Sequence, residues 1–296
     1  MEKVKGIALI QVLIISLVLS LLGIFILQTG QEQVKTSSQI KKSFELRLQL
    51  ESTEALLTNA LLTAPNYNDP NNVNEIATIW NFHGSVFKIN GVEVSIQDLG
   101  GLISLNTTGG DLIGDFLVYM GSEQAQAKEF VDSLRDWKDE DSRVFRQGAE
   151  SEYYRNSNLK GARNGYLQSL GEVLHIKGAK KNRLDKLLQY FTVEHVSGFN
   201  PLNAPKEVMA SFVKNKSTVE KLLELRDNGQ LSANVFYKYT GFSSGESLTF
   251  STGNLLRITM RVKSDDQTLS KQFIVNLRVR SKHRPFVMTD VSWNLE

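Results

Sequence analysis

The chain has no cysteine, only four histidines and only five prolines in 296 residues. Without cysteine it has no disulfide, no thiol nucleophile and no thiolate metal site. This absence does not argue against export, because a domain of this size buries an adequate core without disulfides. The histidines are far apart and none has a second ligand at helical spacing, so we interpret them as surface or structural residues rather than zinc ligands.

The sequence also lacks a large net charge and lacks the common catalytic motifs. The net charge of +2 is too small to indicate a nucleic acid or an acidic partner. The sequence contains no glycine-rich phosphate loop, no nucleophile elbow and no thiol motif. We therefore do not expect an enzyme.

The dominant feature that is present is an uncharged apolar run over residues 7–27. Its length of about 21 residues spans the hydrocarbon layer of a membrane at helical rise. A secretory signal has a shorter apolar core followed by a cleavage site, which is missing here. The run predicts a retained, single transmembrane helix. Lys3 and Lys5 in front of it predict a cytoplasmic N-terminus and an exported remainder.

The residues after this run predict more helix. No proline occurs over residues 34–63, and apolar residues recur at four-residue steps among charged ones. The resulting apolar stripe comprises Ile40, Phe44, Leu48, Leu56 and Ala60. We expect one helix over residues 7–62, with residues 28–63 outside the membrane and the stripe packed against a domain. Pro65 and Pro70 end this helix.

The remainder of the chain predicts an α+β fold. Residues 86–96 place two β-rich runs around Asn90-Gly91, the pair best suited to a two-residue turn. Further strands are predicted over residues 255–262, 272–280 and 286–293, and helices over residues 111–120, 122–137, 169–174, 180–191, 205–215 and 217–228. We expect the long helix to pack on one antiparallel sheet built from residues 64–100 and 246–296. Residues 101–245 then form a large inserted helical domain.

One loop is crowded with carboxylates: seventeen residues contain Asp136, Asp139, Asp141, Glu150 and Glu152. Calcium prefers such hard oxygen ligands. The loop is not an EF-hand, because positions five and six counted from Asp139 are Arg143 and Val144. Two interpretations stay open: a structural calcium ion, or a loop held by ion pairs with Arg143 and Arg146 without metal.

The N-terminus resembles the class III signal of type IV pilins and of the pseudopilins of type II secretion, a short basic leader that ends in glycine before a retained apolar helix. The resemblance implies that a prepilin peptidase removes residues 1–6 by cutting between Gly6 and Ile7. The fifth mature residue is then Gln11. Most family members have glutamate there, and its lack is typical of the K-type minor pseudopilin at the filament tip. An ordinary signal anchor is the alternative.

Four later segments are similar, in order, to segments of the K-type family. Residues 99–106 resemble its D-x-x-G-x-I-N-L-N segment, and residues 134–154 resemble its D-W-I-D-x-D…G-A-E…Y signature. Residues 166–178 match the following segment more loosely, and residues 199–205 resemble N-x-N-T-A-P. The resemblance implies a pilin-like fold with a large helical insertion, and it implies calcium bound by Asp139, Asp141 and Glu150.

By this resemblance the chain is expected to be a minor pseudopilin at the tip of the type II secretion pseudopilus, which initiates filament assembly for protein export across the outer membrane. The partners implied are the I- and J-type minor pseudopilins, the prepilin peptidase and the inner-membrane secretion platform. The implied location is the bacterial inner membrane, with the C-terminal domain in the periplasm.

Two alternatives stay open. One is a minor pilin of a type IV pilus or competence system. The other is an uncleaved, signal-anchored DNA-binding protein, because residues 201–229 resemble helix-hairpin-helix repeats. The Gly-apolar-Gly hairpin of those repeats is replaced by Val-Lys-Asn-Lys at residues 213–216, so we expect no nucleic acid.

Overall fold

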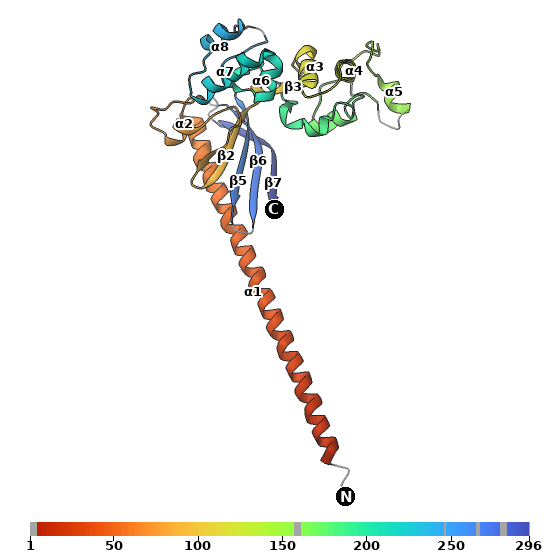
Figure 1. Cartoon of the computed structure of the whole chain (residues 1–296), viewed down its shortest axis with the longest axis vertical. Helices are drawn as coiled ribbons and strands as arrows, with labels where there is room; N and C mark the ends of the chain where they lie inside the picture. Colours follow the sequence, from red (N-terminus) through yellow and green to blue (C-terminus); the bar gives the residue numbers. More distant parts are fainter. Residues whose placement is uncertain (1–4, 157–160, 246, 265–266, 279–282, 296) are drawn as a thin grey trace.

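The computed structural model describes residues 5–156, 161–245, 247–264, 267–278 and 283–295. Its longest element is α1, an uninterrupted helix over Lys5–Thr63 whose 59 residues reach about 88 Å at 1.5 Å per residue. Figure 1 shows α1 as a stalk that projects from a folded head, with the N-terminus at its far end. The single helix predicted over residues 7–62 is confirmed. Of the predicted leader, residues 1–4 lie outside the described residues.

The head contains one five-stranded antiparallel sheet with the strand order β1-β2-β5-β6-β7. The strands are β1 (Phe87–Ile89), β2 (Val92–Asp98), β5 (Leu255–Lys263), β6 (Thr268–Leu277) and β7 (Phe286–Leu295). Asn90 and Gly91 join β1 to β2 with φ of 49° and 82°, the left-handed pair that a two-residue hairpin turn needs. Ile96 of β2 pairs with Ile258 of β5, so the early hairpin and the late strands share one sheet, as predicted.

The position of β6 differs from its prediction over residues 272–280. The Ser264 N–H, just after β5, donates to the Gln267 carbonyl at 2.8 Å. Pairing therefore resumes at once, with Thr268 opposite Lys263. The strand ends at Leu277, and residues 279–280 of the predicted strand lie outside the described residues.

After the apolar run of residues 7–27, α1 carries two apolar stripes rather than one. The stripe that packs on the sheet comprises Leu46, Leu50, Leu57, Ala60 and Leu61, all buried. Except for Ala60, the predicted stripe is wrong: Ile40, Phe44, Leu48 and Leu56 are 66, 61, 50 and 43% exposed. Leu46, Leu50 and Leu57 recur at four and seven residues, so they share one helix face, and these leucines meet the sheet. We call Ile40, Phe44, Leu48 and Leu56 the outward stripe.

An ion pair fixes α1 to the sheet. The Lys271 ammonium on β6 donates to the Glu54 carboxylate on α1, and the two side chains are only 10 and 15% exposed. The same ammonium lies over the Trp293 ring on β7, 4.7 Å from the ring centroid. By contrast, residues 7–28 of α1 are exposed along their whole length. The head therefore holds only the second half of α1.

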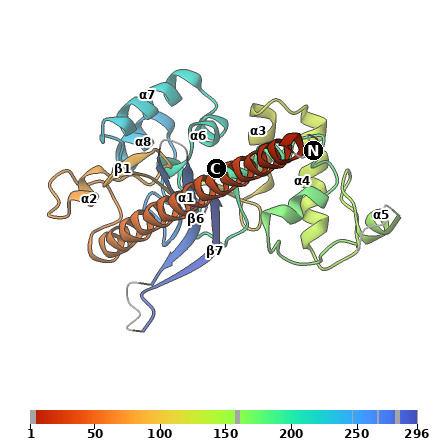
Figure 2. The same ribbon diagram turned by 90° about the horizontal axis from the view of Figure 1, so that it is seen from below.

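Between β2 and β5 the chain forms the helical insertion, which spreads over the end of the head away from the N-terminus (Figures 1 and 2). Its helices are α3 (Gly110–Tyr119), α4 (Gln124–Lys138), α5 (Ser151–Asn156), α6 (Lys206–Val213), α7 (Lys216–Asp227) and α8 (Ala233–Thr240), and its short strands β3 (Ile103–Ser104) and β4 (Phe191–Thr192) pair in parallel. A separate core around Phe116, Phe130 and Phe191 supports these elements. A further helix, α2 (Glu75–Ile79), precedes the sheet.

Two of the helices predicted in this region are 3₁₀ rather than α-helical, and the second is divided into two short pieces. Residues 169–174 and 180–191 form 3₁₀ turns at Leu170–His175, Leu184–Lys186 and Leu188–Tyr190. Gly178 and Arg183 interrupt the segment with φ of 86° and 51°. A Cβ at Gly178 would lie 3.1 Å from the Phe130 backbone nitrogen, so close packing against α4 holds the chain in this bend. Tertiary packing here overrides the local helical pattern.

Asp98, at the end of β2, joins the sheet to the insertion. Its carboxylate accepts hydrogen bonds from the Gly100 N–H and from the side-chain amides of Asn200 and Asn203. The Asn200 N–H in turn donates to the Gly100 carbonyl at 2.7 Å. Residues 99–106 and 199–205, which the sequence singled out separately, therefore meet at this junction.

Candidate functional site

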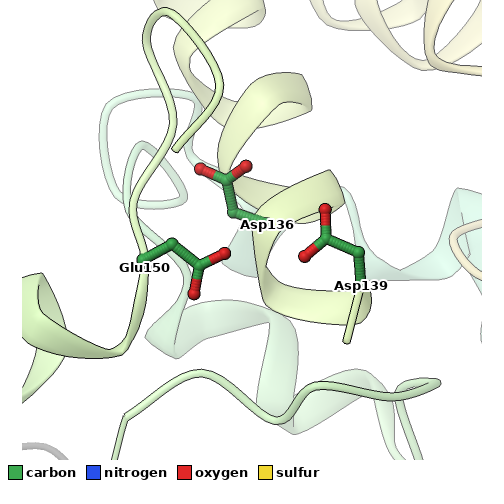
Figure 3. A group of neighbouring side chains, drawn as sticks. All are labelled: Asp136, Asp139 and Glu150. Atoms are coloured by element: carbon green, nitrogen blue, oxygen red, sulfur yellow. The ribbon is translucent and has the colours of Figure 1, made fainter. Parts of the chain in front are cut away.

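Three carboxylates converge where α4 ends. Asp136 lies in the last turn of α4, Asp139 is the residue after the helix, and Glu150 immediately precedes α5. One carboxylate oxygen from each residue lies within 4.8 Å of the others. Figure 3 shows the Asp139 and Glu150 side chains pointing toward each other, with the Asp136 carboxylate turned away from them in this view. Three hard oxygen donors at this spacing can share one cation.

The hydrogen bonds of these carboxylates are incomplete. Asp136 is fully buried and accepts from the Phe145 N–H at 3.1 Å, and the Glu150 Oε2 accepts from the Ser151 N–H at 3.2 Å. Asp139 Oδ1 and Glu150 Oε1 are buried and have no hydrogen-bond partner among the described residues. Buried, unpaired carboxylate oxygens are costly, so the geometry favours a bound cation over an empty cluster.

The electrostatics agree with this geometry. Burial is the main cause that raises the pKa of all three carboxyls. Repulsion from neighbouring carboxylates, including Asp141 and Asp136, raises the pKa of Asp139 and Glu150 further. Within the described ranges, no lysine or arginine lies within 4.0 Å of these carboxylates, and Arg143 and Arg146 form no ion pair with them. The Lys177 ammonium, which donates to the Gly148 carbonyl at 3.0 Å, lowers the pKa of Asp136 but forms no ion pair with the cluster, so the three carboxylates still fit a divalent ion.

The surrounding loop is built to approach this cluster closely. A Cβ at Gly148 would lie 1.9 Å from the Asp136 Oδ2, so only glycine fits there. The Trp137 ring packs edge-on against the Tyr154 ring at 4.8 Å, and the Trp137 Nε1–H donates to the Glu172 carboxylate at 2.8 Å. These contacts, together with buried Gly148, place Glu150 opposite the end of α4.

The structure brings together two of the three residues predicted to bind calcium. Asp139 and Glu150 lie in the cluster, whereas Asp141 is exposed and accepts from the Arg143 N–H at 2.7 Å. The third member is Asp136, which the sequence analysis counted in the acidic loop but not among the ligands. The signal that could have found Asp136 is its spacing of three residues from Asp139 at the end of a predicted helix, because residues three apart lie on one helix face.

The predicted processing residues, Gly6 and Ile7, and the predicted assembly residue, Gln11, lie on α1. Gly6 is within the helix, and Ile7 is 59% exposed. Gln11 is exposed amid apolar side chains and carries no charge. By length and composition α1 can cross a membrane, and the outward stripe continues its apolar surface beyond the membrane-spanning run.

The connection between α6 and α7, which resembled a DNA-binding hairpin, has other partners. The Lys214 ammonium lies 2.7 Å from the Asp115 carboxylate on α3. The Asn215 side chain caps α7 by accepting from the Thr218 N–H at 3.0 Å. Both residues therefore have structural roles, and the α6–α7 connection lacks the glycine-flanked amides that meet phosphate.

Comparison with known proteins gives a family match over part of the chain and a solved structure with a similar fold. Residues 101–195 match the family model for type II secretion system (T2SS), protein K. A chain in the crystal structure of the GspK–GspI–GspJ complex from the type 2 secretion system of enterotoxigenic Escherichia coli has a similar fold, with a TM-score of 0.56 and 15% sequence identity. The likeness covers 88% of this chain and 99% of that chain. No curated protein sequence matches the chain.

A long N-terminal helix whose second half packs on an antiparallel sheet gives this protein a pilin-like α+β fold, and this helix is long and apolar enough to cross a membrane. The family match falls in the helical insertion that distinguishes it from a plain pilin fold. Residues 101–195 are thus similar to protein K of type II secretion, and the chain as a whole has the fold of a chain in the GspK–GspI–GspJ complex.

Proposed function

We propose that this protein forms the tip of the pseudopilus, where it associates with the I- and J-type minor pseudopilins and initiates filament assembly. The observation that carries the proposal is the outward stripe of α1. It continues the apolar surface of residues 7–27 beyond the membrane, and the head of the same chain leaves it uncovered. Apolar side chains exposed along one helix face are the surface that a neighbouring helix buries.

Two further observations support a position at the tip. The helical insertion covers the end of the head farthest from the N-terminus (Figure 1), so a subunit stacked there would meet helices rather than an open sheet. Gln11 offers no carboxylate to the amine of another subunit, and a lone ammonium in lipid is costly. The GspK relative was crystallised in a complex with GspI and GspJ, which supports the same choice of partners.

Processing and location follow from the same mechanism. A prepilin peptidase removes residues 1–6, and Ile7 becomes the N-terminus of a helix that stays in the inner membrane. The head then lies in the periplasm, because Lys3 and Lys5 hold the N-terminal side in the cytoplasm. The secretion platform of the inner membrane receives the assembled tip.

Calcium has a structural role in this proposal. Asp136, Asp139 and Glu150 hold the ion, which neutralises their mutual repulsion and fills the hydrogen-bonding capacity of Asp139 Oδ1 and Glu150 Oε1. It pins the loop over residues 139–150, which is too polar to be held by apolar burial.

Copurification tests the assembly proposal. Phe44→Asp, in the outward stripe, is expected to abolish copurification with co-expressed I- and J-type pseudopilins, because it places a carboxylate in the buried helix contact. The matched control is Gln39→Asp, which at 100° per residue lies about 140° around α1 from Phe44 and about 180° from Leu48. Both positions are exposed, so neither change alters the melting of the head. Copurification of Phe44→Asp at the level of the unaltered chain would contradict the proposal.

A further inference from the structure

The last strand of the sheet, β7, has an open edge. Among the described residues, β7 pairs with β6 on one side and with no strand on the other, and Figure 1 shows it at the outside of the sheet. Proteins protect such edges with short strands, proline or charged side chains. β1, at the opposite edge, has three residues, whereas β7 has ten, without proline and with Asp290 as its one charged residue. A register shift and a φ of 51° at Asp290 mark a β-bulge, so the regular open edge comprises residues 291–295.

Hydrogen bonds at the end of β6 show which of its backbone groups turn toward β7. The Leu277 N–H donates to the Asn254 carbonyl on the β5 side. The N–H of the next residue, Arg278, donates to the Pro285 carbonyl on the β7 side. In an antiparallel sheet, the N–H and C=O groups of successive residues turn to opposite sides of the strand. Odd-numbered residues of β6 therefore bond to β5, and even-numbered residues bond to β7.

The same alternation places main-chain hydrogen-bonding groups at the open edge of β7. Ser292 and Asn294 pair with even-numbered residues of β6, so their N–H and C=O groups turn toward β6. The N–H and C=O of Trp293, which lies between them, therefore turn to the open edge. The side chains of Val291 and Trp293 are 49 and 39% exposed. The end of β7 thus presents main-chain donors and acceptors beside exposed apolar side chains.

Arg47 connects this edge with the outward stripe of α1. The carbon of its guanidinium lies 5.1 Å from the centroid of the Trp293 ring. At 100° per residue, Ile40 and Phe44 of the outward stripe lie about 20° and 60° around α1 from Arg47. These two exposed residues are therefore on the side of α1 that borders β7. A subunit whose helix covers the outward stripe brings its own head next to the open edge.

We propose that the open edge of β7 accepts an extended strand from the head of the minor pseudopilin that packs on the outward stripe. The choice of partner rests on the proposed function, whereas the strand contact is a separate claim. Main-chain hydrogen bonds to Trp293 hold the strand, and its alternate apolar side chains pack against Val291 and Trp293. A helix docked at this edge would leave the main-chain groups of Trp293 without protein partners, so the edge favours a strand.

Hydrogen–deuterium exchange, resolved to single amides, tests the strand contact. The full-length chain is compared alone and in complex with the I- and J-type pseudopilins, in the same detergent. We expect the outward-facing Trp293 amide to exchange at least about tenfold more slowly in the complex, and the amides of α8 to exchange equally in both samples. A complex that forms without slower exchange at Trp293 would overturn the strand contact and leave the proposed function standing. Absence of any complex would overturn both.

Two substitutions at one position separate the main chain from the side chain. Trp293→Thr keeps the N–H, whereas Trp293→Pro also removes it, which an edge strand tolerates where the N–H faces away from its sheet. We expect Trp293→Pro to bind the partners at least about fivefold more weakly than the matched Trp293→Thr. Equal binding by the two folded variants would contradict the proposal. Should Trp293→Pro unfold the head, exchange at Trp293 in the unaltered complex decides. Exchange at Trp293 that slows as the chain alone is concentrated would assign the edge to a second copy and overturn the proposal.

Discussion

The Asp98 carboxylate accepts a hydrogen bond from the side-chain amide of Asn203 at 2.8 Å, across 105 positions of sequence. Asp98 ends β2, and Asn203 lies in the turn before α6. Asp98 has no exposed surface, and its burial raises the pKa of its carboxyl while the hydrogen bonds from Asn203 and Gly100 oppose the rise. One buried carboxyl thus holds the helical insertion on the sheet, and its donors stabilise the junction.

Asn203→Ala is expected to lower the free energy of unfolding by about 2 kcal/mol at pH 7, because it removes a donor from a buried carboxylate. Urea denaturation of the full-length chain measures this loss. Asn59→Ala, at an exposed position of α1, is the matched control and changes the same quantity by less than about 0.5 kcal/mol. Equal stabilities of the two variants would contradict the role of Asp98 at the junction.

The cost of Asn203→Ala is also expected to depend on pH. A carboxyl whose folded-state pKa is raised contributes stability that is present below its unfolded pKa of about 4 and is lost as pH rises through the folded value. The Asn203 amide stabilises the ionised form, so its removal raises the folded pKa of Asp98 further and costs more at pH 7 than at pH 4. Urea titrations at both pH values should show the cost falling by about half or more at pH 4. A cost that is independent of pH would mean that the carboxylate is not involved.

Calcium is expected to raise the melting temperature of the chain relative to chelator. At a calcium concentration of about 100 times the dissociation constant, the added stability is about 2.7 kcal/mol. Asp139→Asn and Glu150→Gln remove this rise, because each deletes a ligand of the cluster. Asp141→Asn keeps it, since Asp141 lies outside the cluster. If Asp141→Asn alone abolished the calcium-dependent rise in melting temperature, Asp141 would be a ligand, as the sequence resemblance implies, and the cluster assigned here would be wrong.

Breaking the buried ion pair between Glu54 and Lys271 is expected to loosen α1 from the sheet. Glu54→Leu leaves a largely buried ammonium without its partner and should cost about 3 kcal/mol of unfolding free energy. The double variant Glu54→Leu with Lys271→Met should recover much of this loss, because no unpaired charge remains. Glu51→Gln, in an exposed pair with Arg47, changes stability by less than about 1 kcal/mol. Additive losses in the double variant would disprove the coupling.

Features set by local chemistry could be predicted from the sequence. The hairpin at Asn90-Gly91 follows from two residues that tolerate left-handed backbone, and the long helix follows from an apolar run without proline. Both depend on neighbours in sequence rather than on distant contacts. The sheet was predictable as well, because the early hairpin and the late strands are each too small to be stable unless they pair with one another.

Features set by distant packing could not be predicted. On α1 the sequence carries two apolar stripes of similar strength, and only the position of the sheet selects Leu50 and Leu57 for burial while Phe44 stays exposed. Likewise, the bend at Gly178 depends on contact with Phe130. In the acidic cluster, Asp141 fits the family pattern by spacing, but the end of α4 turns Asp136 toward Glu150 instead.

The central claim, that this protein occupies the tip with the outward stripe of α1 against its partners, is tested most directly by site-specific crosslinking in membranes that contain the assembled system. The chain has no cysteine, so single cysteines report single positions. Phe44→Cys in the outward stripe is expected to crosslink to the I- or J-type pseudopilin. Asn228→Cys, which follows α7 at the far end of the head (Figure 1), is expected to crosslink to no pseudopilin. Crosslinks from Asn228→Cys to a pseudopilin, with none from Phe44→Cys, would show a subunit stacked above this one and contradict the account.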